Sequence, residues 1–158
     1  MRKRLIFPIR WTGAVLRRGW LELDRAAVVE VTSEAAAHPI EGALLNEGGR
    51  GWRAATLGVQ TVRLLFDKPQ TITHIRLVFK EQEFARTQEF VLRWSEDGGT
   101  SWKDIVRQQW NFSPPTTVDE REDYGVELSD ATALELTINP DISRSDRYAS
   151  LESLQVAV

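Results

Sequence analysis

The sequence contains no cysteine, and this absence excludes two kinds of stabilising site. A chain of 158 residues without cysteine forms no disulfides and no thiolate metal sites. Such a composition fits a reducing compartment, where disulfides are rare. A chain of this length is expected to form one domain whose core is large enough to fold without covalent cross-links.

Long apolar runs are also missing. No stretch approaches the roughly 20 apolar residues that a membrane-spanning helix requires. At the N-terminus a basic segment, residues 2–4, precedes an apolar stretch that contains Pro8 and stops at Arg10. This stretch is shorter than the apolar part of a secretion signal. We therefore expect a cytoplasmic protein with no membrane span.

The sequence also lacks a strong charge of one sign and the patterns of common catalytic sites. A net charge of -3 argues against nucleic acid as the partner. The only histidines are His38 and His74, and there is no Gly-x-Ser-x-Gly or His-Glu-x-x-His motif. Nothing in the sequence places two carboxylates across a cleft, as a glycosidase requires. We expect a protein that is not an enzyme.

What the sequence does contain is a clear β-hairpin pattern in residues 86–102. Phe90, Leu92 and Trp94 alternate with polar residues, which is the period of a strand with one buried face. The Asp-Gly-Gly sequence at residues 97–99 follows, and glycine readily adopts the positive φ of a hairpin turn. The pattern predicts structure well and chemistry poorly.

Similar patterns recur along the chain, separated by turn signals and without any long helical pattern. Strands are expected near residues 28–32, 59–67, 72–79, 86–95, 102–110, 124–128, 134–138 and 151–158, with one short helical turn after Pro39. This predicts an all-β fold, an antiparallel sandwich or jelly roll of about eight strands spanning residues 26–158. Residues 1–25 form a basic, aromatic extension that either packs on the domain or contacts an anionic partner, and a strand is expected at its residues 20–23.

The order of strands also predicts which loops share an end of the sandwich. If successive strands are antiparallel, every second connection lies at the same end. One end then holds three short turns, at residues 68–70, where Pro69 favours a turn, and at residues 97–99 and 129–130. The other holds longer loops near residues 49–57, 81–88, 110–123 and 140–148. Long loops on a rigid scaffold commonly form binding sites, so we place the ligand site at that end.

These loops contain aromatic and polar side chains suited to a small polar ligand. Trp110-Asn111-Phe112 combines rings that can stack on a sugar with an amide that can bind its hydroxyls, although both rings could instead pack in the core. Several charged residues are expected at the same end, and they form either a salt-bridged rim or a polar pocket. They are Arg50, Arg53, Arg86, Arg144 and Arg147, with Glu81, Glu83, Asp141 and Asp146 as possible partners. The residues predicted to contact ligand are Trp110, Asn111, Phe112, Arg86, Gln88, Arg50, Trp52 and Arg144.

The order and spacing of several segments resemble the discoidin family, also called the coagulation factor 5/8 type C family, which includes the family 32 carbohydrate-binding modules. The matching segments are residues 31–39, 46–52, 69–77, 90–102 and 149–151. The resemblance covers about residues 28–158. It implies a galactose-binding-like jelly-roll β-sandwich. It also implies a non-catalytic binder of sugars, phospholipid head groups or proteins.

The resemblance raises the question of a structural calcium ion, which many relatives hold through an aspartate in the loop before the tryptophan and a glutamate in the last strand. Here Asn46, followed by Glu47, stands near the first position and Ser153 at the second. Because calcium prefers several carboxylate ligands, we expect no calcium site and no other cofactor.

Two functions fit these observations. The leading one, favoured by the aromatic and arginine content of the loops and by the resemblance, is a non-catalytic module that binds a carbohydrate-like or other small polar ligand through the long loops at one end of the sandwich. The second is an intracellular protein–protein adaptor with the same fold. The missing secretion signal and the arginine-rich N-terminal segment favour the second function.

Overall fold

The structure is a computed structural model that describes residues 19–45 and 50–158. The predictions for residues 1–18 and for Asn46 and Glu47 lie outside this part of the chain. The described elements are α2 (Leu23–Ala26), β1 (Ala27–Val31), α3 (Glu41–Leu44), β2 (Trp52–Arg53), β3 (Gln60–Lys80), β4 (Arg86–Ser95), β5 (Lys103–Phe112), β6 (Asp119–Asn139), β7 (Ser150–Leu151) and β8 (Ser153–Ala157). Within the described ranges no helix is long and apolar enough to cross a membrane.

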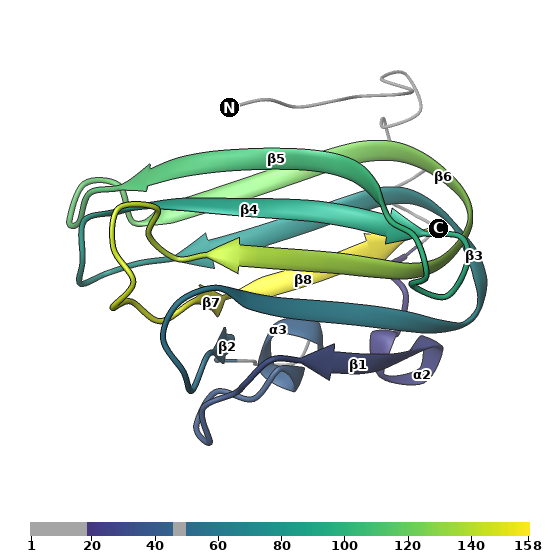
Figure 1. The fold of residues 1–158 in the computed structure, drawn as a ribbon, viewed down its shortest axis with the longest axis horizontal. Coiled ribbons are helices and arrows are strands. Elements are labelled where there is room, and N and C mark those ends of the chain that lie inside the picture. Colours follow the sequence, from purple (N-terminus) through teal and green to yellow (C-terminus); the bar gives the residue numbers. More distant parts are fainter. Residues whose placement is uncertain (1–18, 46–49) are drawn as a thin grey trace.

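Two long bent strands, β3 and β6, connect the two layers of the sandwich (Figure 1). In one layer, the first half of β3 pairs with β1 on one side and with the second half of β6 on the other. The second half of β6 also pairs with β4, and β4 pairs with β5 at the edge of this layer. The second half of β3 pairs with the first half of β6 and with β8 to form the other layer. The pairs in both layers are antiparallel, which confirms the predicted all-β sandwich.

The bends in β3 and β6 correct the predicted strand boundaries. The expected turns near residues 68–70 and 129–130 lie within these strands rather than between separate ones. Pro69 cannot donate a ladder hydrogen bond, and the register shifts between Leu65 and Gln70. Asp130 has a φ of 56°, in the left-handed region. These local irregularities let each strand pass from one layer to the other.

The core lies between the layers and follows the predicted alternation. Phe90 and Leu92 are fully buried, and the Phe90 ring stacks on Phe79 of the opposite layer at 5.3 Å between centroids. Each fully buried side chain of this kind contributes about 1.5–3 kcal/mol relative to exposure. Apolar packing between the layers therefore holds the scaffold that positions the loops.

The segment before β1 differs from its prediction. Residues 20–23 were expected to form a strand, but α2 begins at Leu23, whose side chain is buried in the core. Trp20 makes an isolated antiparallel bridge to Ala157 of β8 and lies beneath the Arg76 guanidinium, 4.9 Å from ring centroid to Cζ. The described part of the extension thus packs on the sandwich, and the described chain has two short helices instead of one.

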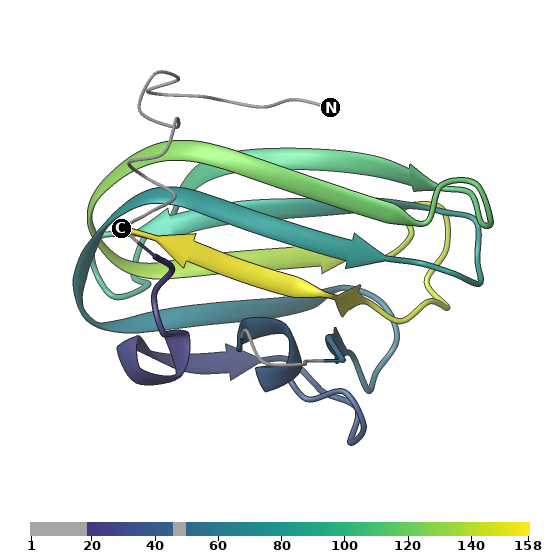
Figure 2. The same ribbon diagram turned by 180° about the vertical axis from the view of Figure 1, so that it is seen from behind.

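The two ends of the sandwich differ as the strand order predicts. At one end lie the bends of β3 and β6 and the β4–β5 turn, where the Gly98 amide donates to the Thr132 hydroxyl (Figure 1). At the other end lie the longer loops after β3, β5 and β6, together with the segment before β3 (Figures 1 and 2). Hydrogen bonds from Gly58 to Arg147 and from Ile142 to Thr87 tie these loops together.

Candidate functional site

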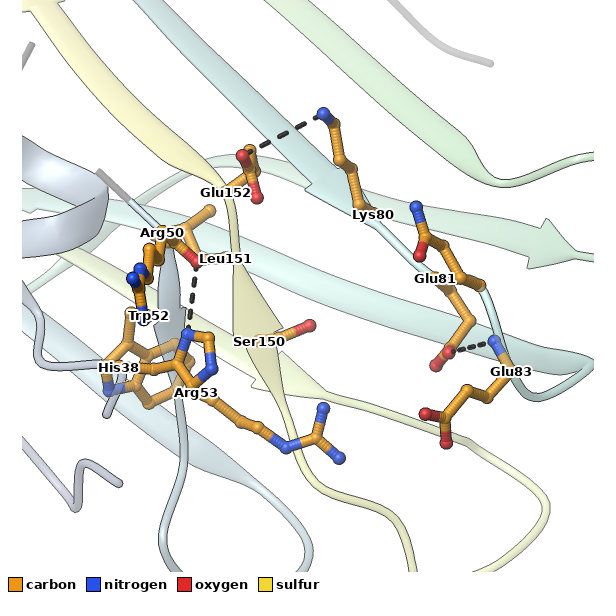
Figure 3. Close-up of a pocket in the computed structure, with 12 residues that line it drawn as sticks. His38, Arg50, Trp52, Arg53, Lys80, Glu81, Glu83, Ser150, Leu151 and Glu152 are labelled. Carbon is orange, nitrogen blue, oxygen red and sulfur yellow. Dashed lines mark hydrogen bonds and ion pairs between the residues drawn. The ribbon is translucent and has the colours of Figure 1, made fainter. Parts of the chain in front are cut away.

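A pocket of about 380 Å³ opens where the small sheet of β2 and β7 meets the loop after β3 (Figure 3). Its lining combines cations, carboxylates and neutral polar groups. The residues that line it are His38, Arg50, Gly51, Trp52, Arg53, Lys80, Glu81, Gln82, Glu83, Ser150, Leu151 and Glu152. This lining is suited to a polar ligand rather than to an apolar one.

Backbone contacts hold the β2 side of the pocket in place. Arg53 pairs with Ser150 of β7, and its amide donates to the carbonyl of His38. The Trp52 indole is buried and donates to the carbonyl of Ser33 at 2.9 Å. Gly51 has a φ of 73°, and a Cβ there would lie 3.0 Å from the carbonyl oxygen of Leu151 in β7, so only glycine fits easily.

Two exposed aromatic rings lie outside the pocket lining but next to residues that form it, and an arginine lies over part of each ring. The Arg53 guanidinium lies 5.5 Å from the Tyr148 ring centroid, and that of Arg147 lies 4.1 Å from the Phe84 centroid. Tyr148 is 41% exposed and Phe84 is 39% exposed. Such cation–π pairs orient both partners while leaving ring surface open to a ligand.

Exposed apolar side chains concentrate around this end of the molecule. Seven large apolar residues are exposed in the described part of the chain: Val28, Leu45, Leu57, Val59, Phe84, Ile142 and Tyr148. The last five lie in the segment before β3 and in the loops after β3 and β6, which are the connections of the long-loop end. Apolar surface that gathers in one place marks a contact surface more often than scattered exposure does.

On the β3 side, the carboxylate of Glu81 is held in the pocket wall. It accepts hydrogen bonds from the Arg86 guanidinium at 2.6 Å and from the amides of Glu83 and Phe84. Burial raises the pKa of Glu81, but these hydrogen bonds and the Arg86 charge outweigh it and keep the pKa below its ordinary value. The carboxylate is therefore ionised and hydrogen-bonded to Arg86 and to the loop amides, and these contacts fix the loop after β3 against the domain.

Behind this wall, Arg86 begins a polar network between the two layers. Its guanidinium donates to the Gln88 side chain at 3.1 Å and to the Pro140 carbonyl at 2.7 Å, and lies 4.6 Å from the Phe112 ring centroid. Gln88 donates in turn to Glu120 of β6 at 3.2 Å. The Arg86 side chain is 1% exposed, so this network braces the loop end from inside.

Two carboxyl groups lie at the inner end of the network. Glu120 and Glu122 are both fully buried on the same inward face of β6. Burial, with the neighbouring Glu122 carboxyl, raises the pKa of Glu120 to about 9. Neither residue lines the pocket, so the pair offers no accessible acid and base for hydrolysis.

The structure therefore changes the role of four predicted ligand residues. Arg86, Gln88 and Phe112 belong to the interior, and the buried Trp52 lies beneath the pocket as an anchor of β2. Their side chains brace the site rather than face solvent. Arg50 is the predicted residue whose side chain is exposed at the pocket.

The expected loop tip at residues 110–112 is the last part of β5 instead. Strand alternation turns Trp110 and Phe112 inward, and Trp110 is half-buried against the core. Asn111 faces outward and accepts a hydrogen bond from Thr87 at 2.6 Å. Arg144 is exposed in the loop after β6 and is paired with Asp146, so it does not line the pocket.

The two exposed aromatic residues near the pocket were not predicted from the sequence, whereas several of the charged residues around it were. Arg53 and Arg147 were expected at this end, together with Glu81 and Glu83 as partners. Tyr148 and Phe84 received no role, because a lone aromatic in a loop has no periodic pattern that tells an exposed ring from a buried one. The available signal was their position in loops predicted to share one end.

Solved structures share this architecture. The chain matches a pectin-binding carbohydrate-binding module with a TM-score of 0.61 and 18% identity over 84% of this chain and 90% of that one. It matches the family 32 module of Clostridium perfringens NanJ, solved with galactose, with a TM-score of 0.59 and 12% identity over 88% and 98% of the two chains. This is the fold of the family 32 carbohydrate-binding modules.

A further family 32 module, from AlyQ, was solved with 4,5-unsaturated mannuronic acid and matches with a TM-score of 0.60 and 14% identity over 83% of this chain and 94% of that one. No protein-family model matches the sequence, and no curated protein matches it either. The family 32 likeness thus rests on the fold, and it confirms the predicted galactose-binding-like architecture.

Proposed function

We propose that this protein is a non-catalytic carbohydrate-binding module whose ligand site is the pocket between β2, β7 and the loop after β3. The observation that most supports this is an exposed aromatic ring, Tyr148, beside a polar pocket with Arg53 at its edge. Sugars present an apolar ring face together with many hydroxyl groups. A site for them therefore needs both an aromatic surface and fixed polar groups.

The scaffold supports the same proposal. The pocket walls come from backbone-paired strands and from a loop that Glu81 and Arg86 hold in place, so the site is largely formed before a ligand arrives. A preformed site loses less conformational entropy on binding. The structural neighbours named above include modules described as binding pectin or solved with galactose.

Replacing Tyr148 with alanine is expected to weaken saccharide binding by about tenfold or more, because stacking and apolar burial on one ring are worth roughly 1–2 kcal/mol. The wild-type protein should first be screened on a glycan array at concentrations that detect weak binding. The strongest hit is then titrated calorimetrically against both proteins.

The matched control is Val28→Ala, which removes another exposed apolar side chain but lies on β1, away from the loop end. It should leave the affinity unchanged. An array with no saccharide hit, or equal losses in the two variants, would contradict the proposed function.

A second candidate is a protein–protein adaptor that uses the same end. The five exposed apolar residues of the long-loop end favour it, because protein interfaces also bury such surface. Affinity purification from the native host distinguishes the two proposals. A stoichiometric partner that Tyr148→Ala releases, combined with no glycan binding, would favour the adaptor.

A further inference from the structure

The charges around the pocket are unevenly balanced. Lys80 pairs with Glu152 at 3.9 Å, so these two charges offset one another. Glu81 is satisfied by Arg86 and by two backbone amides. Three lining charges then remain, Arg50, Arg53 and Glu83. Among them the cations outnumber the carboxylate, although the whole chain has a net charge of -3.

The guanidinium groups of Arg50 and Arg53 are open to a ligand. Among residues 19–45 and 50–158, neither group makes a hydrogen bond or an ion pair. Each guanidinium has five N–H donors in a planar arrangement that matches a carboxylate. Figure 3 shows the Arg53 side chain extending from β2 past His38, and Arg53 is exposed. The Arg53 guanidinium lies over the Tyr148 ring, but its N–H donors have no hydrogen-bond partner among these residues and are available to an anionic group of a ligand.

Neutral polar groups accompany these cations. The Ser150 hydroxyl and the His38 ring line the same pocket, and the His38 Nδ1 lies 3.2 Å from the Arg50 carbonyl. Glu83 adds an exposed acceptor on the opposite wall. Hydroxyl groups on a ring can donate to this carboxylate and to the His38 Nε2, and can accept from Ser150. The pocket thus combines carboxylate recognition with hydroxyl recognition, next to the Tyr148 ring.

We propose that the ligand is an acidic saccharide, a chain of uronic acid units. One sugar carboxylate is bound by Arg53, Arg50 adds positive charge to the pocket, and the sugar ring packs on the exposed part of Tyr148. This inference rests on the proposed saccharide-binding function and specifies its ligand class. The planar fork of arginine favours a carboxylate, and the exposed ring favours a sugar over a free inorganic anion.

The test is a calorimetric comparison of an oligogalacturonide with its methyl-esterified form and with a neutral galactose oligomer of equal length. The acidic oligomer should bind about tenfold or more tightly than the other two, because a charge-assisted bidentate contact is among the strong hydrogen bonds. Its affinity should fall as the salt concentration rises. Arg53→Gln should remove the preference for the acidic oligomer and keep the weaker neutral binding.

Arg25→Gln is the matched control, since Arg25 is an exposed arginine of α2 that does not line the pocket. Equal binding of acidic and neutral oligomers by the wild-type protein would overturn the inference and leave the proposed function standing. Equal binding of a sulfated neutral oligomer would overturn the assignment to a carboxylate. Binding of none of these saccharides would overturn both proposals.

Discussion

Replacing Arg86 with methionine is expected to lower the free energy of unfolding by about 3–5 kcal/mol, because removing one partner of a buried ion pair leaves the other uncompensated. The variant loses the hydrogen bonds to Glu81, Gln88 and the Pro140 carbonyl, and methionine replaces only the apolar stem. Urea unfolding followed by tryptophan fluorescence measures the change. Arg86 is thus expected to affect ligand binding indirectly, because it stabilises the fold and holds the loop after β3 in place.

Arg25→Met is the control, because its ion pair with Glu22 at 3.5 Å is exposed and such pairs contribute little. It should change the free energy of unfolding by less than about 0.5 kcal/mol. If Arg86→Met kept full stability yet lost saccharide binding, Arg86 would contact the ligand directly. That was the role expected from the sequence, and the buried network would then be misassigned.

Replacing Glu120 with glutamine is expected to raise the free energy of unfolding at pH 8 by on the order of 1–3 kcal/mol. Burial raises the pKa of Glu120 from 4.5 to about 9 in the folded protein. The stability that protonation of this group contributes is complete below pH 4.5 and is lost as the pH rises toward about 9. Glutamine stays neutral throughout, and its carbonyl oxygen can still accept from Gln88.

The measurement is urea unfolding of both proteins at about pH 5 and pH 8, where the stabilisation should appear chiefly at the higher pH. Glu135→Gln is the matched control. Glu135 is also buried, but it pairs with Arg63 at 2.7 Å and Arg93 at 3.7 Å on the outer sheet face. The control should therefore be destabilised at both pH values. A destabilised Glu120→Gln variant at pH 8 would contradict the raised pKa.

The fold could be predicted from the sequence because its strongest signals are local. Phe90 and Leu92 alternate with polar residues and are buried, and Gly98 and Gly99 adopt positive φ in the turn after β4. The continuity of β3 through Pro69 could not be predicted in the same way. It depends on pairing with the distant β6, and the local proline signal indicated a turn.

The grouping of the loops could be predicted better than the exposure of their side chains. Strand order indicated which loops share one end, but not which side chains face solvent. Trp110 and Phe112 sit two residues apart on one strand, so both face inward once the strand extends to Phe112. Arg86 is buried with Glu81, Gln88 and the Pro140 carbonyl as partners, and the Pro140 contact forms only by tertiary packing.

The most direct test of the central claim is a backbone amide NMR titration with the oligogalacturonide. If the pocket binds the oligomer, the largest changes in amide chemical shift are expected at residues 50–53, 81–84 and 147–152, which form the pocket and carry the exposed aromatic rings next to it. Changes confined to the opposite end, at residues 96–102 and 129–131, or no changes at all, would contradict this claim.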